Sequence, residues 1–318
     1  MDYIPLEKPI VDLECQMEKL KVEATNKEVN VDDKIAALEE KTKKLRDKLF
    51  SNLTTYEIVQ LSRHPQRPTT LEYIGYMTSS FVELHGDRSY YDDKAIVGGI
   101  AKIDEHSVMI IGHQKGHGTK ENIERNFGMP KPEGYRKAKR LMDMANRFKL
   151  PIITLIDTPG AYPGIGAEKR GQSEAIGNNL LQMADYEVPI VCAVIGEGGS
   201  GGALALGVGN SIHMMQYSIY SVISPEGCAS ILLKDAKKAS MMAESLRLTA
   251  AFAHSNHVID SIIQEPTGGA HKNPKQAAAH VKATVLADLE RLSTYSGEEI
   301  KKHRLEKYLK IGCYEYTS

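Results

Sequence analysis

Near the middle of the chain the sequence reads Gly196-Glu197-Gly198-Gly199-Ser200-Gly201-Gly202-Ala203. The residues before it, 188–195, are mostly apolar and β-branched, and the residues after it, 204–206, are apolar again. This order predicts a strand, a tight glycine turn and a buried helix. Such a turn lets the backbone approach a ligand closely and directs the free amides of a helix N-terminus at negative charge. The turn alone leaves open whether that charge is a phosphate, an acyl oxyanion or an enolate.

The composition is ordinary for a globular protein. With 318 residues the chain has room for one large domain and an appendage. Lys and Arg number 40 against 41 Asp and Glu, so the net charge indicates neither nucleic acid nor a membrane as a partner. We find no basic and apolar leader and no apolar run of the roughly 18 residues that a membrane span needs. We therefore expect a soluble, cytoplasmic protein.

The cysteines are few and widely separated, without a CxxC pair. This spacing disfavours a zinc site or a disulfide framework and favours a reducing compartment, so we expect no metal in this chain. One of them lies in the apolar segment before the glycine turn, where a buried structural thiol is expected. The four are Cys15, Cys192, Cys228 and Cys313.

The chain divides into three predicted parts. Residues 1–50 carry two heptad-like apolar stripes and are expected to form a helical hairpin, with Asn30 as the N-cap of the second helix. Packing of this hairpin on its own domain is favoured, and docking on a partner subunit stays open. Residues 51–293 have a mixed α/β pattern, and residues 294–318 are expected to form a C-terminal helix and tail.

Strands and helices alternate through the central part, which predicts parallel strand pairs with right-handed crossovers. The predicted strands cover residues 96–103, 108–112, 151–156, 189–195, 211–215 and 219–222. The predicted helices cover residues 134–148, 167–183, 202–207, 236–251 and 274–292, and a charged helix at 298–309 follows.

Two nucleotide-binding motifs match only superficially. Gly196, Gly198 and Gly201 fit the dinucleotide fingerprint G-x-G-x-x-G, but the match lies deep in the chain and no acid ends the following strand. Asp157-Thr158-Pro159-Gly160 resembles the magnesium motif of GTPases, but the phosphate-binding loop G-x-x-x-x-G-K-[ST] does not occur upstream. Each interpretation therefore lacks a second sequence feature that its binding site requires.

A third match, Gly198-x-Ser200-x-Gly202, fits the nucleophile elbow of hydrolases. A hydrolase would also need an acid and a histidine downstream, and none of the available residues has a distinctive context. A glycine-rich turn contains a serine by chance fairly often, so a nucleophilic Ser200 is disfavoured. The residues that could be proposed are Asp235, Asp260, His254, His257 and His271.

Residues 113–149 form a locally basic segment. A solvated helix face is the favoured interpretation, and binding of a phosphate-bearing ligand is the alternative. Nucleic acid is poorly supported because aromatic residues for base stacking are sparse there. The cations are Lys115, Lys120, Arg125, Lys131, Arg136, Lys137, Lys139, Arg140, Arg147 and Lys149.

Two glycine turns stand one strand–helix unit apart, at residues 157–166 and 196–202. Each follows an apolar strand, so in a parallel sheet both would lie at the carboxyl edge, where ligands bind. Two backbone turns that face one cleft can direct two N–H groups at a single oxygen, which is the geometry of an oxyanion hole. Main-chain donors of this kind need no particular side chain.

At this point the sequence closely resembles one family, the α subunit of the carboxyltransferase component of bacterial acetyl-CoA carboxylase. The similarity covers nearly all of residues 5–290. It rests on Asp157-Thr158-Pro159-Gly160-Ala161-Tyr162-Pro163-Gly164, Gly171-Gln172-Ser173-Glu174, the turn from Gly196, and Ser221-Val222-Ile223-Ser224-Pro225-Glu226-Gly227. Further matches are Arg67-Pro68-Thr69-Thr70, Glu83-Leu84-His85-Gly86-Asp87-Arg88, Arg125-Asn126-Phe127-Gly128-Met129, Pro132-Glu133-Gly134-Tyr135-Arg136-Lys137-Ala138 and Gly268-Gly269-Ala270-His271-Lys272.

The resemblance implies an α/β, crotonase-like (ClpP/crotonase) fold, a superhelix of ββα units. It implies transfer of a carboxyl group from carboxybiotin, borne on the biotin carboxyl carrier protein, to acetyl-CoA, giving malonyl-CoA for fatty acid synthesis. The implied partners are a β subunit in an α2β2 heterotetramer, the carrier protein and biotin carboxylase, in a complex that binds ATP. Zinc is expected in the β subunit, which also holds the acetyl-CoA half of the site.

By the same resemblance, the α-subunit amides hold the ureido oxygen of biotin, and the biotin nitrogen then takes the α-proton of acetyl-CoA. No general-base side chain is then required, so Glu197 is interpreted as a structural anchor and Ser200 as a small polar filler. A stand-alone crotonase-fold acyl-CoA hydratase or hydrolase, and a scaffold or nucleic-acid-binding role, remain competing hypotheses. The implied catalytic residues are Gly201, Gly202 and Ala203, with Gly160 and Ala161 on the opposite wall, and the implied cofactor-binding residues are Gly164, Gly166, Gly198 and Gly199.

Overall fold

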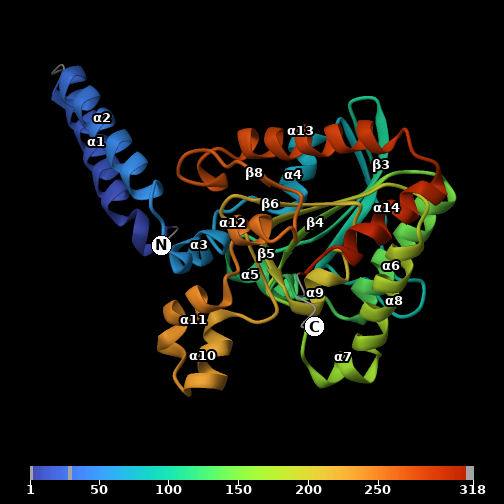
Figure 1. Ribbon diagram of the computed structural model, residues 1–318. Coiled ribbons are helices and arrows are strands. Elements are labelled where there is room, and N and C mark those ends of the chain that lie inside the picture. The colour runs from blue at the N-terminus through green and yellow to red at the C-terminus, as the bar shows by residue number, and fades with distance from the viewer. Residues whose placement is uncertain (1–2, 28–30, 313–318) are drawn as a thin grey trace, which may run out of the picture.

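A mixed eight-stranded sheet forms the centre of the computed structural model, which describes residues 3–27 and 31–312 (Figure 1). The strand order is β1-β2-β3-β4-β5-β6-β8, and β7 pairs with the end of β5. The strands are β1 (Ser80–Glu83), β2 (Ile96–Ile103), β3 (His106–His113), β4 (Ile152–Thr158), β5 (Ile190–Gly199), β6 (Ser211–Met215), β7 (Ile219–Ser221) and β8 (Ser261–Ile263).

The predicted parallel pairing holds from β3 to β8 but not for the first strands. β3–β4, β4–β5, β5–β6 and β6–β8 are parallel, whereas β1–β2 and β2–β3 are antiparallel. Only Asp104 and Glu105 separate β2 from β3. A two-residue connection can join only antiparallel neighbours, because a parallel pair needs a crossover of a dozen or more residues.

Helices cover both faces of the sheet (Figure 1). On one face, α4 (Thr70–Met77) and α13 (Pro274–Leu292) share a core with alternate strand residues such as Ile153. On the other, α6 (Pro132–Arg147) and α8 (Gln172–Asp185) pack with the intervening ones, such as Ile152. Every residue of β4 is buried, which matches its mostly apolar sequence. Because helices cover both faces of the sheet, the loops that follow the strands lie at its edges.

The predicted N-terminal hairpin is present and projects away from the sheet (Figure 1). It consists of α1 (Lys8–Lys27) and α2 (Asp32–Phe50), joined by a hydrogen bond of 2.7 Å from Arg46 to Glu14. The expected N-cap, Asn30, lies outside the described residues, so its role stays a prediction.

Two long predicted helices are wrong, because each is broken by a residue in the left-handed region. The helix expected at 167–183 is divided by Gly171, with φ 81°, into α7 (Ile165–Lys169) and α8. The helix expected at 236–251 is divided by Arg247, with φ 50°, and its pieces are η3 (Ala236–Lys238), α11 (Ala239–Leu246) and α12 (Ala250–Ser255). The predicted helix at 202–207 is the shorter and earlier α9 (Ser200–Leu204).

Several short elements were not predicted at all, among them β1 and β8. The others are η1 (Pro5–Glu7), α3 (Thr55–Ser62), α4, α5 (Gly118–Glu124), η2 (Asn126–Gly128), α10 (Pro225–Leu233) and η4 (Ala270–Lys272). The last helix, α14 (Gly297–Leu309), lies close to its predicted range. Among residues 3–27 and 31–312, none of the helices combines the length and apolarity that crossing a bilayer would require.

Candidate functional site

The two glycine turns meet backbone to backbone at the carboxyl ends of β4 and β5. A Cβ atom placed on Gly202 would lie 2.7 Å from the amide nitrogen of Ala161 and 2.7 Å from the carbonyl carbon of Gly160. A Cβ on Gly199 would lie 2.2 Å from the carbonyl oxygen of Pro159. These spacings leave no room for a side chain, so the contact between the turns depends on glycine.

The turn after β5 is sharp. Ser200 has φ 50°, a left-handed conformation that is uncommon for a residue with a side chain, and it begins α9. On the facing turn, Gly160 has φ 148°, and its conformation is held by hydrogen bonds in both directions with the Thr158 hydroxyl.

Backbone donors at this contact are free to bind a ligand. Gly201 and Gly202 occupy the first turn of α9, where amides have no acceptor within the helix. In the part of the chain that the structure describes, the Ala161 amide on the facing turn also donates to no carbonyl or side chain. Gly202 is buried, whereas Gly201 and Ala161 are half-buried. Such a set of donors suits a single developing negative charge.

A network of paired charges lies behind the turns. The ammonium of Lys115 is 2.7 Å from Asp157 Oδ1 and 2.8 Å from Glu197 Oε2. Arg63 bonds to the other oxygen of Glu197 at 2.5 Å and to Glu226 at 2.9 Å. Asp157 Oδ1 also accepts the backbone N–H of Glu197 at 2.9 Å. The network ties together the ends of β3, β4 and β5, the end of α3 and the start of α10.

The electrostatics of this network explain why Glu197 is unsuited to act as a base. Burial acts to raise the pKa of its carboxyl group, but the charges of and hydrogen bonds from Lys115 and Arg63 outweigh burial and lower that pKa. The carboxylate is thus a paired, weakly basic group. This agrees with the interpretation of Glu197 as a structural anchor.

A hollow opens beside the turn. It has a volume of about 330 Å³ and is lined by Ser200, Gly201, Leu204, Tyr220, Ser221 and Val222. A larger cavity of about 440 Å³ lies on the other side of the charge network, which contributes Arg63, Lys115, Asp157 and Glu197 to its lining. Because those charges are already paired with one another, the hollow next to the glycine turn is the better candidate for a ligand.

The nucleophile-elbow interpretation of Ser200 finds no partner in the structure. No histidine among residues 3–27 and 31–312 hydrogen-bonds its hydroxyl, and His271, one of the downstream candidates, is bound to Glu7. The sharp turn thus has the backbone shape of an elbow without the base that a nucleophile needs.

We therefore expect the substitution Ser200→Ala to keep most of the carboxyl-transfer activity that the resemblance implies, within about threefold of the unmodified protein. Ser200→Gly is the matched control, because glycine adopts the positive φ without strain. Initial rates of both variants at saturating substrate measure the effect. A loss of a factor of about 10³ or more in both would restore Ser200 as a nucleophile.

Three of the described ligand-type residues converge elsewhere, at Glu7, His64 and His271. Glu7 Oε2 is 2.7 Å from His64 Nε2, and Glu7 Oε1 is 2.8 Å from His271 Nε2. His64 Nδ1 accepts the backbone N–H of Gln66, so the ring proton is on Nε2 and points at Glu7. The Glu7 carboxylate thus bonds both imidazole rings, and the cluster fastens the segment before α1 to the core.

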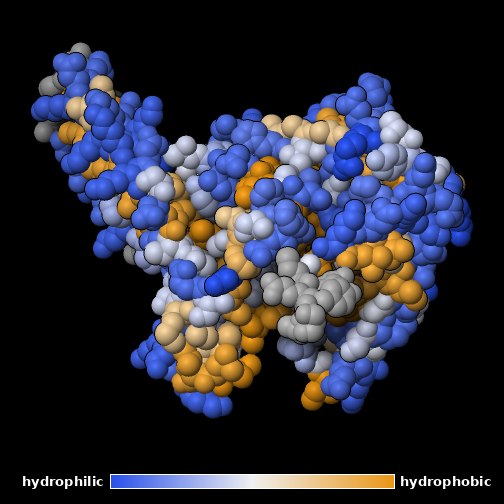
Figure 2. Space-filling view, in the orientation of Figure 1, coloured by the Kyte–Doolittle hydropathy of each residue, from blue (hydrophilic) through white to orange (hydrophobic). Residues whose placement is uncertain are grey.

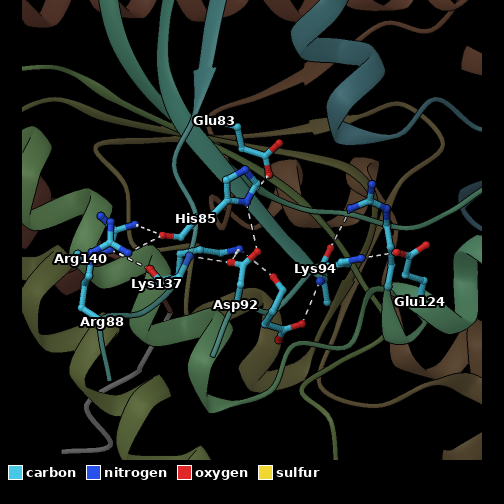
Figure 3. A network of polar contacts seen from close by, with 12 residues as sticks. Glu83, His85, Arg88, Asp92, Lys94, Glu124, Lys137 and Arg140 are labelled. Carbon is cyan, nitrogen blue, oxygen red and sulfur yellow. Dashed lines mark hydrogen bonds and ion pairs between the residues drawn. The ribbon is translucent and has the colours of Figure 1, made fainter. Parts of the chain in front are cut away.

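Most cations of the basic segment are paired within the protein. Figure 3 shows Lys137 reaching Asp92 and Arg140 donating to the backbone carbonyl of His85, contacts that bind the loop after β1 to α6. Lys94 and Glu124 make a further ion pair there. Other pairs are Arg125–Glu121, Arg136–Asp87, Lys139–Asp143 and Lys149–Glu187. Pairing of this kind favours the interpretation of a solvated, structural segment.

The remaining candidate glycines make close contacts within the protein, and their predicted role in cofactor binding stays a prediction. Gly198 faces the ring of Tyr220, where a Cβ would lie 2.4 Å from a ring carbon, and Gly199 faces Pro159. Gly164 is the N-cap of α7 and packs against Tyr162, and Gly166 lies within α7. Gly201, Gly202, Ala203, Gly160 and Ala161 lie where the two turns meet or in α9. Their ligand contacts are not fixed by these positions and stay a prediction.

Sequence reasoning missed His113 and Lys115 as parts of the site. Both follow the apolar core of β3, so the rule that ligands bind at the carboxyl ends of parallel strands could have identified them. They were counted only as members of a basic segment.

The chain matches the family model described as acetyl co-enzyme A carboxylase carboxyltransferase-like over residues 3–312. It is 54% identical over 315 residues to the acetyl-coenzyme A carboxylase carboxyl transferase subunit alpha of Edwardsiella ictaluri, covering 98% of this chain and 99% of that protein. The protein of the same name from Escherichia coli K12 is 56% identical over 315 residues, with the same coverage.

Solved structures agree at the level of the fold. The chain resembles a transcarboxylase 12S crystal structure with a TM-score of 0.57 at 19% identity, covering 70% of this chain and 41% of that one. It resembles a Pseudomonas malonate decarboxylase hetero-tetramer in complex with coenzyme A with a TM-score of 0.59 at 15% identity, covering 74% and 91%. These similarities confirm the predicted crotonase-like fold.

Proposed function

The chain belongs to the family of acetyl-CoA carboxylase carboxyltransferase alpha subunits, and from this membership we propose that its two glycine turns form the carboxybiotin half of the active site. The enzyme of this family is a biotin-dependent carboxyl transferase, and its product with acetyl-CoA is malonyl-CoA. The observation that carries the proposal is the contact between Gly202 and Ala161, which brings unpaired amides from both turns to one place.

The proposed donors are the amides of Gly201, Gly202 and Ala203, with Gly160 and Ala161 as the opposite wall. Carboxybiotin would supply the carboxyl group, and these amides would stabilise the negative charge that its release places on the ureido oxygen. Fixed amide dipoles stabilise such charge without reorganising, and the loss of one donor typically costs about 10²–10³ in rate. The donor set fits the group, because neutral main-chain N–H groups can bind an oxygen that is uncharged before release and charged during it.

The site also needs a partner, which we propose to be the β subunit. Leu204 and Val222, which line the hollow beside α9, are exposed, and Figure 2 shows further apolar surface over α10 and α11. The exposed fractions are 44% for Leu204, 75% for Val222, 60% for Ile231, 67% for Leu232 and 50% for Met241. Exposed apolar surface next to a binding site is typical of a surface that a partner covers.

Finer expectations from the resemblance belong to the same proposal. They are an α2β2 heterotetramer whose β subunit holds zinc and the acetyl-CoA half, delivery of carboxybiotin by the carrier protein, an ATP-binding biotin carboxylase in the complex, and a cytoplasmic location. Gly164, Gly166, Gly198 and Gly199 are proposed to line the cofactor side. The division at residues 1–50, 51–293 and 294–318 is retained as a proposal about domains.

Partner dependence is the direct test. We expect no malonyl-CoA- and biotin-dependent carboxyl transfer from the chain alone and full transfer after the candidate β subunit is added, because half of the site is missing without it. The spectrophotometric rate of acetyl-CoA release from malonyl-CoA measures both. The β subunit alone is the control and should also be inactive.

Two outcomes would contradict the proposal. Transfer by the isolated chain would show that its site is complete, and thioester hydration or hydrolysis by the isolated chain would favour the stand-alone hydratase or hydrolase.

A further inference from the structure

The carbonyl of Gly202 cannot complete the usual helical hydrogen bond. In a regular helix it would accept the N–H of Leu206, but that N–H donates to Ala203 O at 3.2 Å as α9 tightens and ends. Gly202 is buried, so its carbonyl needs a donor from elsewhere in the protein. The neighbouring carbonyl of Gly201 is already satisfied by the N–H of Ala205 at 3.0 Å.

The missing donor is the ring of His113. Its Nε2 lies 3.2 Å from the carbonyl oxygen of Gly202, and the residue is fully buried. A carbonyl can only accept, so Nε2 carries the proton and donates it. The backbone of His113 is held by its pairing with Ile96 in β2 and by a hydrogen bond of 2.5 Å from the Thr70 hydroxyl to its carbonyl.

The ring stays neutral at any working pH. Burial lowers the pKa of His113 to about 3, and the nearby charge of Lys115 lowers it further. Its other nitrogen, Nδ1, is buried, and the Gly202 and Leu155 backbones raise the pKa too little to offset burial. A histidine in this state does not exchange protons during turnover, so its contribution is the fixed N–H that it presents to Gly202.

We propose that His113 is a positioning residue for carboxyl transfer, which holds the Gly202 carbonyl and thereby keeps the first turn of α9, with its Gly201 and Gly202 amides, in place against the Ala161 turn. The inference rests on the proposed function. A peptide unit is planar, so a hydrogen bond to the Gly202 carbonyl restricts rotation of the whole Gly202–Ala203 peptide.

The substitution His113→Phe tests the proposal, because it keeps an aromatic ring in the core and removes the donor. In the complex with the β subunit we expect kcat to fall about 10- to 100-fold, in line with a misaligned group in an active site. The KM for malonyl-CoA should stay unchanged, because that substrate binds the partner's half. His113→Gln should restore kcat to within about threefold, because the glutamine amide reaches the same position as Nε2.

Thr154→Val is the matched control. It removes another buried side-chain hydrogen bond to a carbonyl, from Thr154 Oγ1 to Leu206 O at 2.7 Å, without touching the two turns. Its thermal stability should fall by an amount similar to that of His113→Phe, while its kcat should stay near that of the unmodified complex. Equal losses of kcat in both variants would overturn the proposal, because they would reflect general loosening of the core.

Further outcomes separate this inference from the proposed function. Should His113→Phe fail to fold, the pair His113→Gln and His113→Asn decides, because the asparagine amide stops short of Gly202. Unchanged kcat in both Gln and Asn variants would overturn the positioning role. An unmodified complex without any carboxyl transfer would instead overturn the proposed function itself.

Discussion

Gly202→Val is expected to abolish carboxyl transfer, lowering kcat by a factor of at least about 10³. Even a single added carbon on Gly202 would lie 2.7 Å from the Ala161 nitrogen, and the atoms in its way are backbone. A valine must therefore separate the two turns. The separation removes the Ala161 wall and displaces the Gly202 and Ala203 amides together, so more than one donor is lost. The rate with malonyl-CoA and biotin, measured in the complex with the β subunit, reports the loss.

Controls for this variant come from the same protein. Gly177, in α8, has no atom within 4 Å of an added Cβ, so Gly177→Ala should leave the activity unchanged. At Gly201 an added Cβ would meet only the Ile176 side chain at 3.7 Å, so Gly201→Ala should lose far less than Gly202→Ala. The Gly202→Val variant should still assemble with the β subunit, which size-exclusion chromatography would show. Full turnover by an assembled Gly202→Val complex would remove this glycine from the mechanism.

Lys115→Met is expected to cause the largest loss of stability among the substitutions considered, about 3 kcal/mol of unfolding free energy. The side chain of Lys115 is 20% exposed, and its two carboxylate partners are 7% and 8% exposed. Removing the cation leaves Asp157 without its ion-pair partner beside Glu197, which keeps Arg63. Because these carboxylates stand at the ends of β4 and β5, kcat should fall as well. Chemical denaturation measures the free energy.

The pH dependence of this loss has a definite sign. The pKa of Glu197 lies below its ordinary value of 4.5, since Lys115 and Arg63 outweigh the effect of burial. Glu197 thus stabilises the fold above about pH 4.5, and this contribution disappears as the pH falls through the lowered pKa. Lys115→Met raises that pKa and shrinks the contribution. The stability gap between the two proteins should therefore be widest at neutral pH and narrow on acidification.

Lys115→Arg supplies the comparison, because it keeps the positive charge and should lose much less stability than Lys115→Met. A gap that stays constant from pH 7 to pH 4 would show that Lys115 acts through packing of its alkyl chain. A gap that widens on acidification would contradict the assigned charge network.

The fold was predictable where a run of apolar residues met glycine. The segment before Gly196 is apolar and β-branched, and it forms β5 because such residues suit a strand buried on both faces. Breaks inside helices were not predictable. Arg247 takes φ 50° although nothing local favours it, so the position of that break is set by tertiary packing. Gly171 could have been recognised as a break, since glycine adopts positive φ at little cost.

The two backbone turns of the candidate site were predictable from the sequence, but the charged side chains that pack behind them were not. Glycine density at residues 157–166 and 196–202 predicted two turns at one sheet edge, and both lie there. The side chains behind them come from segments far apart in the sequence: Lys115 lies 82 residues from Glu197, and Arg63 lies 134 from it. Pairings over such separations follow from strand order, which periodicity alone does not give.

The contact between the two turns also decides which experiments can see this site. Conventional alanine scanning removes side chains, and the proposed donors at Gly201, Gly202 and Ala203 are main-chain groups that every alanine variant retains. In such a scan, substitutions at the glycines would report steric crowding, and Ala203 would not be tested because it is already alanine. Replacing the Ala203 amide by an ester through chemical ligation would delete one N–H and leave every side chain in place. The proposed chemistry of this enzyme thus depends on main-chain N–H groups and on the absence of side chains where the two turns meet.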